Sequence, residues 1–153
     1  MERAFAVIEA LALALWIGAL AGFAFVFAPL AFRTLGDVTL FGALAASVLH
    51  VLNETGYACG AIALISIFVR NREDASLAIG SARRAVLVFI MLVLLVLQDR
   101  VVMPAVHVAG DATFGRLHLF STVLYALVLA LGLVTLAMSV LARPESIRRR
   151  FGR

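Results

Sequence analysis

Four side chains with chemical potential lie close together in His50-x-x-Asn53-Glu54-x-x-Tyr57, inside an otherwise apolar segment. An imidazole, an amide, a carboxylate and a phenol at positions i, i+3, i+4 and i+7 share one helix face. An ionisable group at membrane depth is costly and normally faces the protein interior, where it has a partner. We therefore expect this stripe to face other helices rather than lipid.

Later segments supply polar groups at the depth of the stripe. With a rise of about 1.5 Å per residue, Glu54 lies roughly 22 Å from Val69, and Arg100 lies roughly 23 Å from Ala85. Because Glu54 and Arg100 are opposite in charge, we expect a buried ion pair that lowers the desolvation cost of each. The predicted polar cluster, placed toward the outer leaflet, comprises His50, Asn53, Glu54, Tyr57, Gln98, Asp99, Arg100, His107, Arg116, His118, Ser121 and Tyr125.

Three kinds of chemistry fit this cluster. The first is a hydrogen-bond network that fixes the register of three helices, with His50 donating to Asp99 or lying near His118. The second is ligation of haem b or of a transition metal such as copper or zinc by His50 and His118, with His107 in reserve. In that case Glu54 and Asp99 would orient the imidazoles. The third is a path for protons or ions through Glu54 and Asp99.

The sequence offers no set of residues for catalysis. No serine or cysteine nucleophile stands at a recognisable spacing from a histidine. There is no glycine-rich phosphate loop and no zinc-protease helix motif. We therefore expect a protein that is not an enzyme.

The composition is that of an integral membrane protein. Of 153 residues, 64% are hydrophobic and 14% are charged, and the mean hydropathy is +1.09. A soluble domain of this size could not cover so much apolar surface. The net charge of +4 comes from arginine, since lysine is absent, and it indicates orientation and lipid contact rather than nucleic-acid binding. The single cysteine, Cys59, excludes an intrachain disulfide and is expected to be a packing residue.

The hydropathy pattern predicts an all-α, polytopic four-transmembrane-helix bundle, because a span needs about 20 apolar residues. The first run is too long for a signal peptide, so we expect it to be retained. Arginine-rich segments after the second and fourth helices predict that both termini are cytoplasmic. Asp37 is expected to cap the second helix. The expected single domain covers residues 1–142, with helices at about 5–30, 38–69, 85–106 and 117–142, followed by a basic cytoplasmic tail at 143–153.

Two pairs of glycines suggest close helix packing. Gly18-x-x-x-Gly22 and Gly56-x-x-x-Gly60 lie on consecutive helices, and glycine lets backbones approach in lipid. The two pairs are expected to pack on each other, or one of them to face a second subunit. Near the cytoplasmic end of the first helix, Glu9 is expected to form hydrogen bonds with Thr135 and Ser139 or to bend toward the interface. Trp16 is expected to pack near mid-membrane.

The stretch Phe114-x-Arg116-Leu117-His118-x-x-Ser121, which opens the last helix, resembles the transmembrane protein 205 family and its bacterial relatives of unknown function. Trp16-Ile17-Gly18, the run to Pro29, Phe32-Arg33 and Pro104 add to the resemblance. It implies a four-helix membrane protein with both termini on one side. It implies that Arg116, His118 and Ser121 are motif positions, and it hints at metal handling without defining a site. We expect the protein to lie in the bacterial inner membrane.

Three functions follow from these observations. The leading hypothesis is a non-enzymatic structural or accessory subunit of a membrane complex or homo-oligomer, in contact with the lipid bilayer and not with nucleic acid. The alternatives are a metal- or haem-binding protein that uses His50 and His118, and a small ion or proton transporter.

Overall fold

In the part of the chain that the structure describes, every regular element is a helix. The computed structural model describes residues 2–73, 78–108 and 111–141, and it describes side chains at 4–72, 80–106 and 113–141. Four helices in these ranges are long and apolar enough to cross a membrane, which confirms the predicted fold class. The elements are α1 (Glu2–Gly22), the π-helical η1 (Phe23–Phe27), α2 (Ala28–Leu35), α3 (Val38–Glu73), α4 (Ala78–Leu97), the π-helical η3 (Gln98–Val102), α5 (Met103–Val108) and α6 (Asp111–Leu141).

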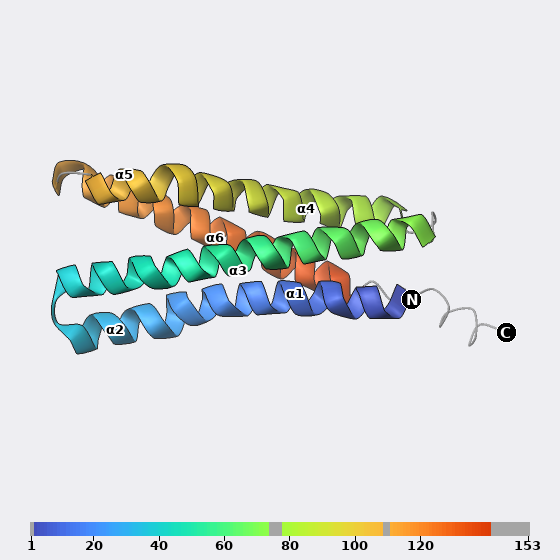
Figure 1. Ribbon diagram of the computed structural model, residues 1–153, viewed down its shortest axis with the longest axis horizontal. Coiled ribbons are helices and arrows are strands. Elements are labelled where there is room, and N and C mark those ends of the chain that lie inside the picture. The colour runs from blue at the N-terminus through green and yellow to red at the C-terminus, as the bar shows by residue number, and fades with distance from the viewer. Residues whose placement is uncertain (1, 74–77, 109–110, 142–153) are drawn as a thin grey trace.

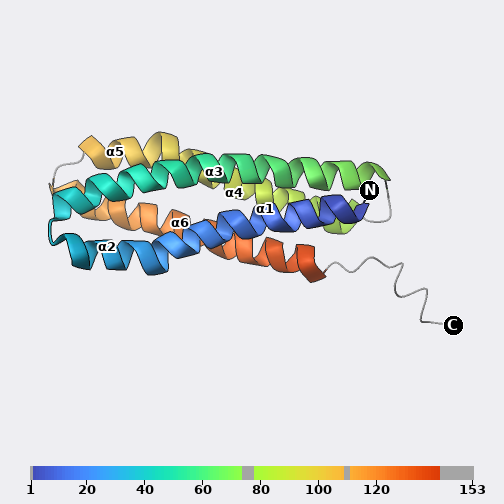
Figure 2. The same cartoon turned by 60° about the horizontal axis from the view of Figure 1, so that its bottom comes forward.

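The elements form four nearly parallel rods (Figures 1 and 2). The first rod is α1–η1–α2, the second is α3, the third is α4–η3–α5 and the fourth is α6. α1 and α4 each pack against both α3 and α6, so α3 and α6 occupy opposite corners of the bundle. We name one end of the bundle the terminal end. It contains the start of α1, the end of α3, the start of α4 and the end of α6 (Figure 1). The opposite end is the hairpin end.

The helices extend beyond the predicted apolar spans. α3 continues to Glu73 rather than ending near Val69, α4 begins at Ala78 and α6 begins at Asp111. Hydropathy marks the immersed part of a helix, whereas the backbone stays helical into the polar interface. The predicted tail at 143–153 lies outside the described residues.

The turn between α2 and α3 follows the predicted capping chemistry. Asp37 Oδ1 accepts hydrogen bonds from the backbone N–H groups of Thr39, at 2.7 Å, and Leu40, at 3.2 Å. These are two of the free amides at the start of α3, so the predicted N-cap is confirmed. Gly36, with φ 63°, occupies the left-handed conformation that commonly ends a helix.

Each π-helical segment precedes a proline by the same interval. The Ala28 N–H donates to Phe23 O just before Pro29, and the Met103 N–H donates to Gln98 O just before Pro104. Proline removes one helical N–H and its ring clashes with the carbonyl four residues earlier. The wider π turn accommodates both effects without ending the rod.

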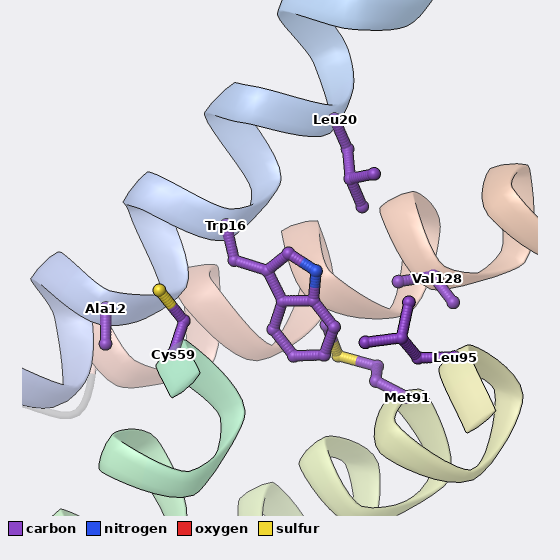
Figure 3. Packing of buried hydrophobic residues seen from close by; sticks show 7 residues of the cluster. All are labelled: Ala12, Trp16, Leu20, Cys59, Met91, Leu95 and Val128. Carbon is purple, nitrogen blue, oxygen red and sulfur yellow. The ribbon is translucent and has the colours of Figure 1, made fainter. Parts of the chain in front are cut away.

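Trp16 occupies the centre of the bundle. Its side chain is 1% exposed and projects from α1 among Cys59 of α3, Met91 and Leu95 of α4, and Val128 of α6 (Figure 3). The predicted mid-bundle packing of Trp16 and the packing role of buried Cys59 are confirmed. Glu9, Arg70 and Arg84 lie on the terminal side of this core, and Asp99 lies on its hairpin side.

Candidate functional site

Asp99 is the centre of a polar network that joins three rods. Its Oδ1 accepts from Asn53 Nδ2 at 3.1 Å, and its Oδ2 accepts from the Tyr57 hydroxyl at 3.2 Å. Arg100 Nε lies 3.2 Å from the same Oδ2. The Tyr125 hydroxyl of α6 donates to Asn53 Oδ1 at 2.9 Å, so α3, η3 and α6 share one continuous set of hydrogen bonds.

A second contact fastens η3 to α6. Gln98 Nε2 donates to Ser121 Oγ at 2.6 Å, and both side chains are buried. Successive residues of η3 therefore serve different neighbours, because Gln98 reaches α6 while Asp99 reaches α3. The π turn before Pro104 sets the direction of both side chains, and π turns often occur where a helix must present such groups.

The predicted stripe on α3 divides into an inner and an outer part. Asn53 is 1% exposed and Tyr57 is half-buried, whereas His50 and Glu54 are exposed. Adjacent residues of an α-helix point about 100° apart. Asn53 therefore faces the network while Glu54 faces outward.

The predicted ion pair between Glu54 and Arg100 is wrong. Arg100 contacts Asp99, its chain neighbour, and Glu54 forms no ion pair among the described residues. His50 does not donate to Asp99, but it lies beside it at a shallow groove on the α3–η3 face. That groove measures about 350 Å³ and is lined by Ala46, Ser47, His50, Asn53, Asp99 and Met103.

The two histidines proposed as ligands lie on opposite corners of the bundle. His50 is exposed on α3, and His118 is exposed on α6, where it stacks on Phe114 with ring centroids 5.8 Å apart. Arg116 is also exposed on α6, and the side chain of His107 lies outside the described residues. Within the described part of the chain, no three His, Cys, Asp or Glu side chains converge as a metal site would require. Ligation of haem or a metal by His50 and His118 stays a prediction.

A buried ion cluster at the terminal end was missed by sequence reasoning. Glu9 of α1 is fully buried, and its Oε2 accepts from Arg70 Nη1 of α3 at 2.7 Å. Arg84 Nε of α4 lies 3.2 Å from Glu9 Oε1. The expected partners are not used, because Thr135 donates to its own helix at Leu131 O and Ser139 Oγ has no hydrogen-bond partner. The signal that could have found this cluster is an arginine near the terminal end of each neighbouring helix, Arg70 on α3 and Arg84 on α4, which from the sequence alone indicates orientation.

An apolar layer separates the two polar clusters. On α3, Asn53 and Arg70 are seventeen residues apart, or roughly 25 Å along the helix. The side chains packed between them are almost fully buried, and they include Leu13, Trp16, Ala63, Ile67, Val88, Met91, Leu95 and Val128. These side chains are apolar, apart from a Trp16 Nε1 group that has no hydrogen-bond partner among the described residues, so they do not link the two clusters by hydrogen bonds or ion pairs.

The two glycine pairs have different surroundings. A Cβ at Gly56 would lie 2.6 Å from Trp16 Nε1, and one at Gly60 would lie 2.6 Å from Leu92 Cδ2. This pair therefore permits close packing of α3 on α1 and α4. A Cβ at Gly18 or Gly22 would meet nothing within 4 Å, so the two pairs do not pack on each other.

Together, the four spans and the two inter-helix polar clusters define an integral membrane protein of the helix-bundle class. A family model described as "Domain of unknown function (DUF4149)" matches residues 11–113, which is more than half of the chain. The chain therefore belongs to this family. No curated protein matches the chain, and no solved structure does.

Proposed function

We propose that this chain is a non-enzymatic structural or accessory subunit of a membrane-protein assembly, a homo-oligomer or a larger complex. The observation that carries the proposal is the position of Glu54 and Arg100 on the outside of the bundle, within helices that cross the membrane. Charged side chains in such segments are costly against lipid and normally meet protein or water. A neighbouring subunit would provide that contact.

The internal network fits a supporting role. Three hydrogen bonds join three rods through the side chains of Asn53, Tyr57, Tyr125 and Asp99. Inter-helix hydrogen bonds of this kind contribute about 0.6 kcal/mol each in membrane proteins, so the network stabilises one arrangement of the helices. A bundle held in one arrangement, with charged side chains exposed on its outer face, is suited to assembly.

The charge distribution supports a cytoplasmic position for both termini. Arg70, Arg72, Arg83 and Arg84 lie toward the terminal end of α3 and α4. Arginine flanking membrane spans favours the cytoplasmic side. We place the protein in the bacterial inner membrane. We also propose kinship with the transmembrane protein 205 family through the stretch 114–121, which lies beyond the matched residues 11–113.

The test is the mass of the protein extracted in lipid nanodiscs from its own membrane, measured by native mass spectrometry. We expect particles that contain more than one 16.4 kDa chain or a second, co-purified membrane protein. Single chains at every expression level, with no companion protein, would contradict the proposal.

A further inference from the structure

One face of the bundle, formed by α3 and α4–η3, carries two opposite charges that point outward. Glu54 is exposed on α3, and among the described residues it forms no ion pair or side-chain hydrogen bond. Arg100 contacts Asp99 through Nε, yet its side chain remains 73% exposed. Both residues lie in segments that cross the membrane, where such exposure is unfavourable.

The internal contacts place these two charges on the same face. Asn53 and Tyr57, which flank Glu54 on α3, both donate to Asp99, which precedes Arg100 on η3. Glu54 and Arg100 therefore flank the contact between these two rods. Asn53 and Asp99 point toward each other, whereas the residues that follow them, Glu54 and Arg100, are exposed on the outside of the bundle.

The ion cluster at the terminal end shows that the two charges also lie at one depth. Arg70 and Arg84 both contact the carboxylate of Glu9, so these two residues lie at the same height along the bundle axis. Glu54 lies sixteen residues before Arg70, and Arg100 lies sixteen residues after Arg84. Both are therefore about 24 Å from the shared level.

We propose that a second copy of this chain docks on the α3–α4 face, related by a two-fold axis along the membrane normal. Glu54 of each copy then pairs with Arg100 of the other. A two-fold interface requires that residue i meet residue j while j meets i. Glu54 and Arg100 lie on one face at equal depth. Two copies with the same orientation in the membrane can therefore place each Glu54 beside the other copy's Arg100.

The surface around Glu54 also favours close approach of another helix. Ser47, Ala58 and Ala61 are exposed on the same side of α3, and small residues let helices in lipid come together. The exposed Gly18 face of α1 is also open, but Glu54 and Arg100 do not belong to it. Docking there would leave both charges against lipid.

This inference rests on the proposed function, because it names the partner of the same face. Its test uses the full chain in liposomes, with dimer fraction measured by two-colour photobleaching over a range of protein-to-lipid ratios. Glu54→Arg alone places arginine against arginine at both contacts, and Arg100→Glu alone places glutamate against glutamate. We expect each variant to weaken self-association at least tenfold, and Arg33→Glu, on exposed α2, to leave it unchanged.

Mixing the two variants gives the sharper result. One Glu54→Arg chain with one Arg100→Glu chain restores two opposite-charge contacts. We expect mixed dimers to regain the native affinity, which a general loss of folding would not produce. Mixed dimers no stronger than either variant alone would overturn the inference.

Because Arg100→Glu also sets a second carboxylate beside Asp99, a cross-link that keeps all charges gives an independent readout. Ala58 of α3 lies four residues from Glu54, and Val96 of α4 lies four residues from Arg100. Both are exposed, and both lie on the terminal side of the charged residue. In a Cys59→Ala background, copies with Ala58→Cys and copies with Val96→Cys should cross-link through a short bis-thiol reagent. Leu133→Cys on α6 is the control and should not react with either.

The outcomes separate the two proposals. Dimers that persist in Glu54→Arg and dissociate in Gly18→Leu would overturn this interface while leaving the assembly role intact. Single chains at all protein-to-lipid ratios, with another membrane protein co-purified from cells, would overturn the second copy as the partner. Single chains with no companion would overturn both proposals.

Discussion

Arg70 Nη1 of α3 lies 2.7 Å from Glu9 Oε2 of α1, inside the bundle. The same carboxylate faces Arg84 of α4, so one buried acid serves two buried guanidinium groups from two other helices. The pairing offsets much of the desolvation cost of all three groups, and it depends on the single negative charge. Glu9 is therefore the residue whose loss should affect the terminal end most.

Replacing Glu9 with glutamine is expected to lower the free energy of unfolding by about 3–5 kcal/mol. The substitution keeps the shape but leaves Arg70 and Arg84 as uncompensated buried charges. Reversible unfolding in mixed detergent micelles measures the change. Glu54→Gln is the matched control, because it makes the same chemical change on an exposed side chain, and it should leave monomer stability unaltered. Equal stability of the two variants would contradict the role given to Glu9.

Replacing Gly56 with alanine is expected to destabilise the bundle by roughly 1–3 kcal/mol, as overpacking of a filled core does. The new Cβ would lie 2.6 Å from Trp16 Nε1 and 2.8 Å from Leu95 Cδ2. Gly18→Ala is the control, since nothing lies within 4 Å of its new Cβ. The same unfolding assay decides the prediction, and a Gly56→Ala protein as stable as Gly18→Ala would refute it.

The sequence predicted the four spans because long apolar runs between charged segments are required to cross a bilayer. It also predicted the cap at Asp37, since that contact depends on residues near in sequence. It predicted the inward side of α3 only in part, because Asn53 and Tyr57 face the bundle whereas His50 and Glu54 are exposed. In lipid both sides of a helix are apolar, so periodicity does not mark the buried face, and Glu54 was grouped with Asn53.

The sequence predicts the members of the Asp99 network but not the ion cluster around Glu9. Helical spacing groups Asn53 with Tyr57, depth adds Asp99 and Tyr125, and the structure joins all four. Depth does not determine rotation about the helix axis, which here depends on the π turn at Gln98–Val102. Arg70 and Arg84 were missed because charges at the end of a span also serve as orientation signals, and only the packing of α1 shows that they turn inward.

The hydrogen bond between Tyr125 and Asn53 is expected to contribute about 0.6 kcal/mol, and no more than about 1.7 kcal/mol. A double-mutant cycle with Tyr125→Phe and Asn53→Ala isolates this coupling. Thr122→Val removes a hydroxyl that donates only within α6, to His118 O, and should show no coupling with Asn53→Ala. A coupling near zero for Tyr125 and Asn53 would show that the hydroxyl does not bind the amide in the membrane.

Replacing Pro104 with alanine is expected to weaken the network without touching any of its members. The new backbone N–H can donate to Arg100 O, so regular α-helical geometry becomes available where η3 is now π-helical. A regular helix over Gln98–Val102 would turn Gln98 and Asp99 relative to their present partners. Pro29→Ala is the matched control, because η1 has the same spacing to its proline but carries apolar side chains. We expect the coupling energy between Asn53 and Asp99, measured by a double-mutant cycle, to fall in Pro104→Ala and to persist in Pro29→Ala. An unchanged coupling in Pro104→Ala would mean that side-chain contacts, and not the proline, hold the π turn.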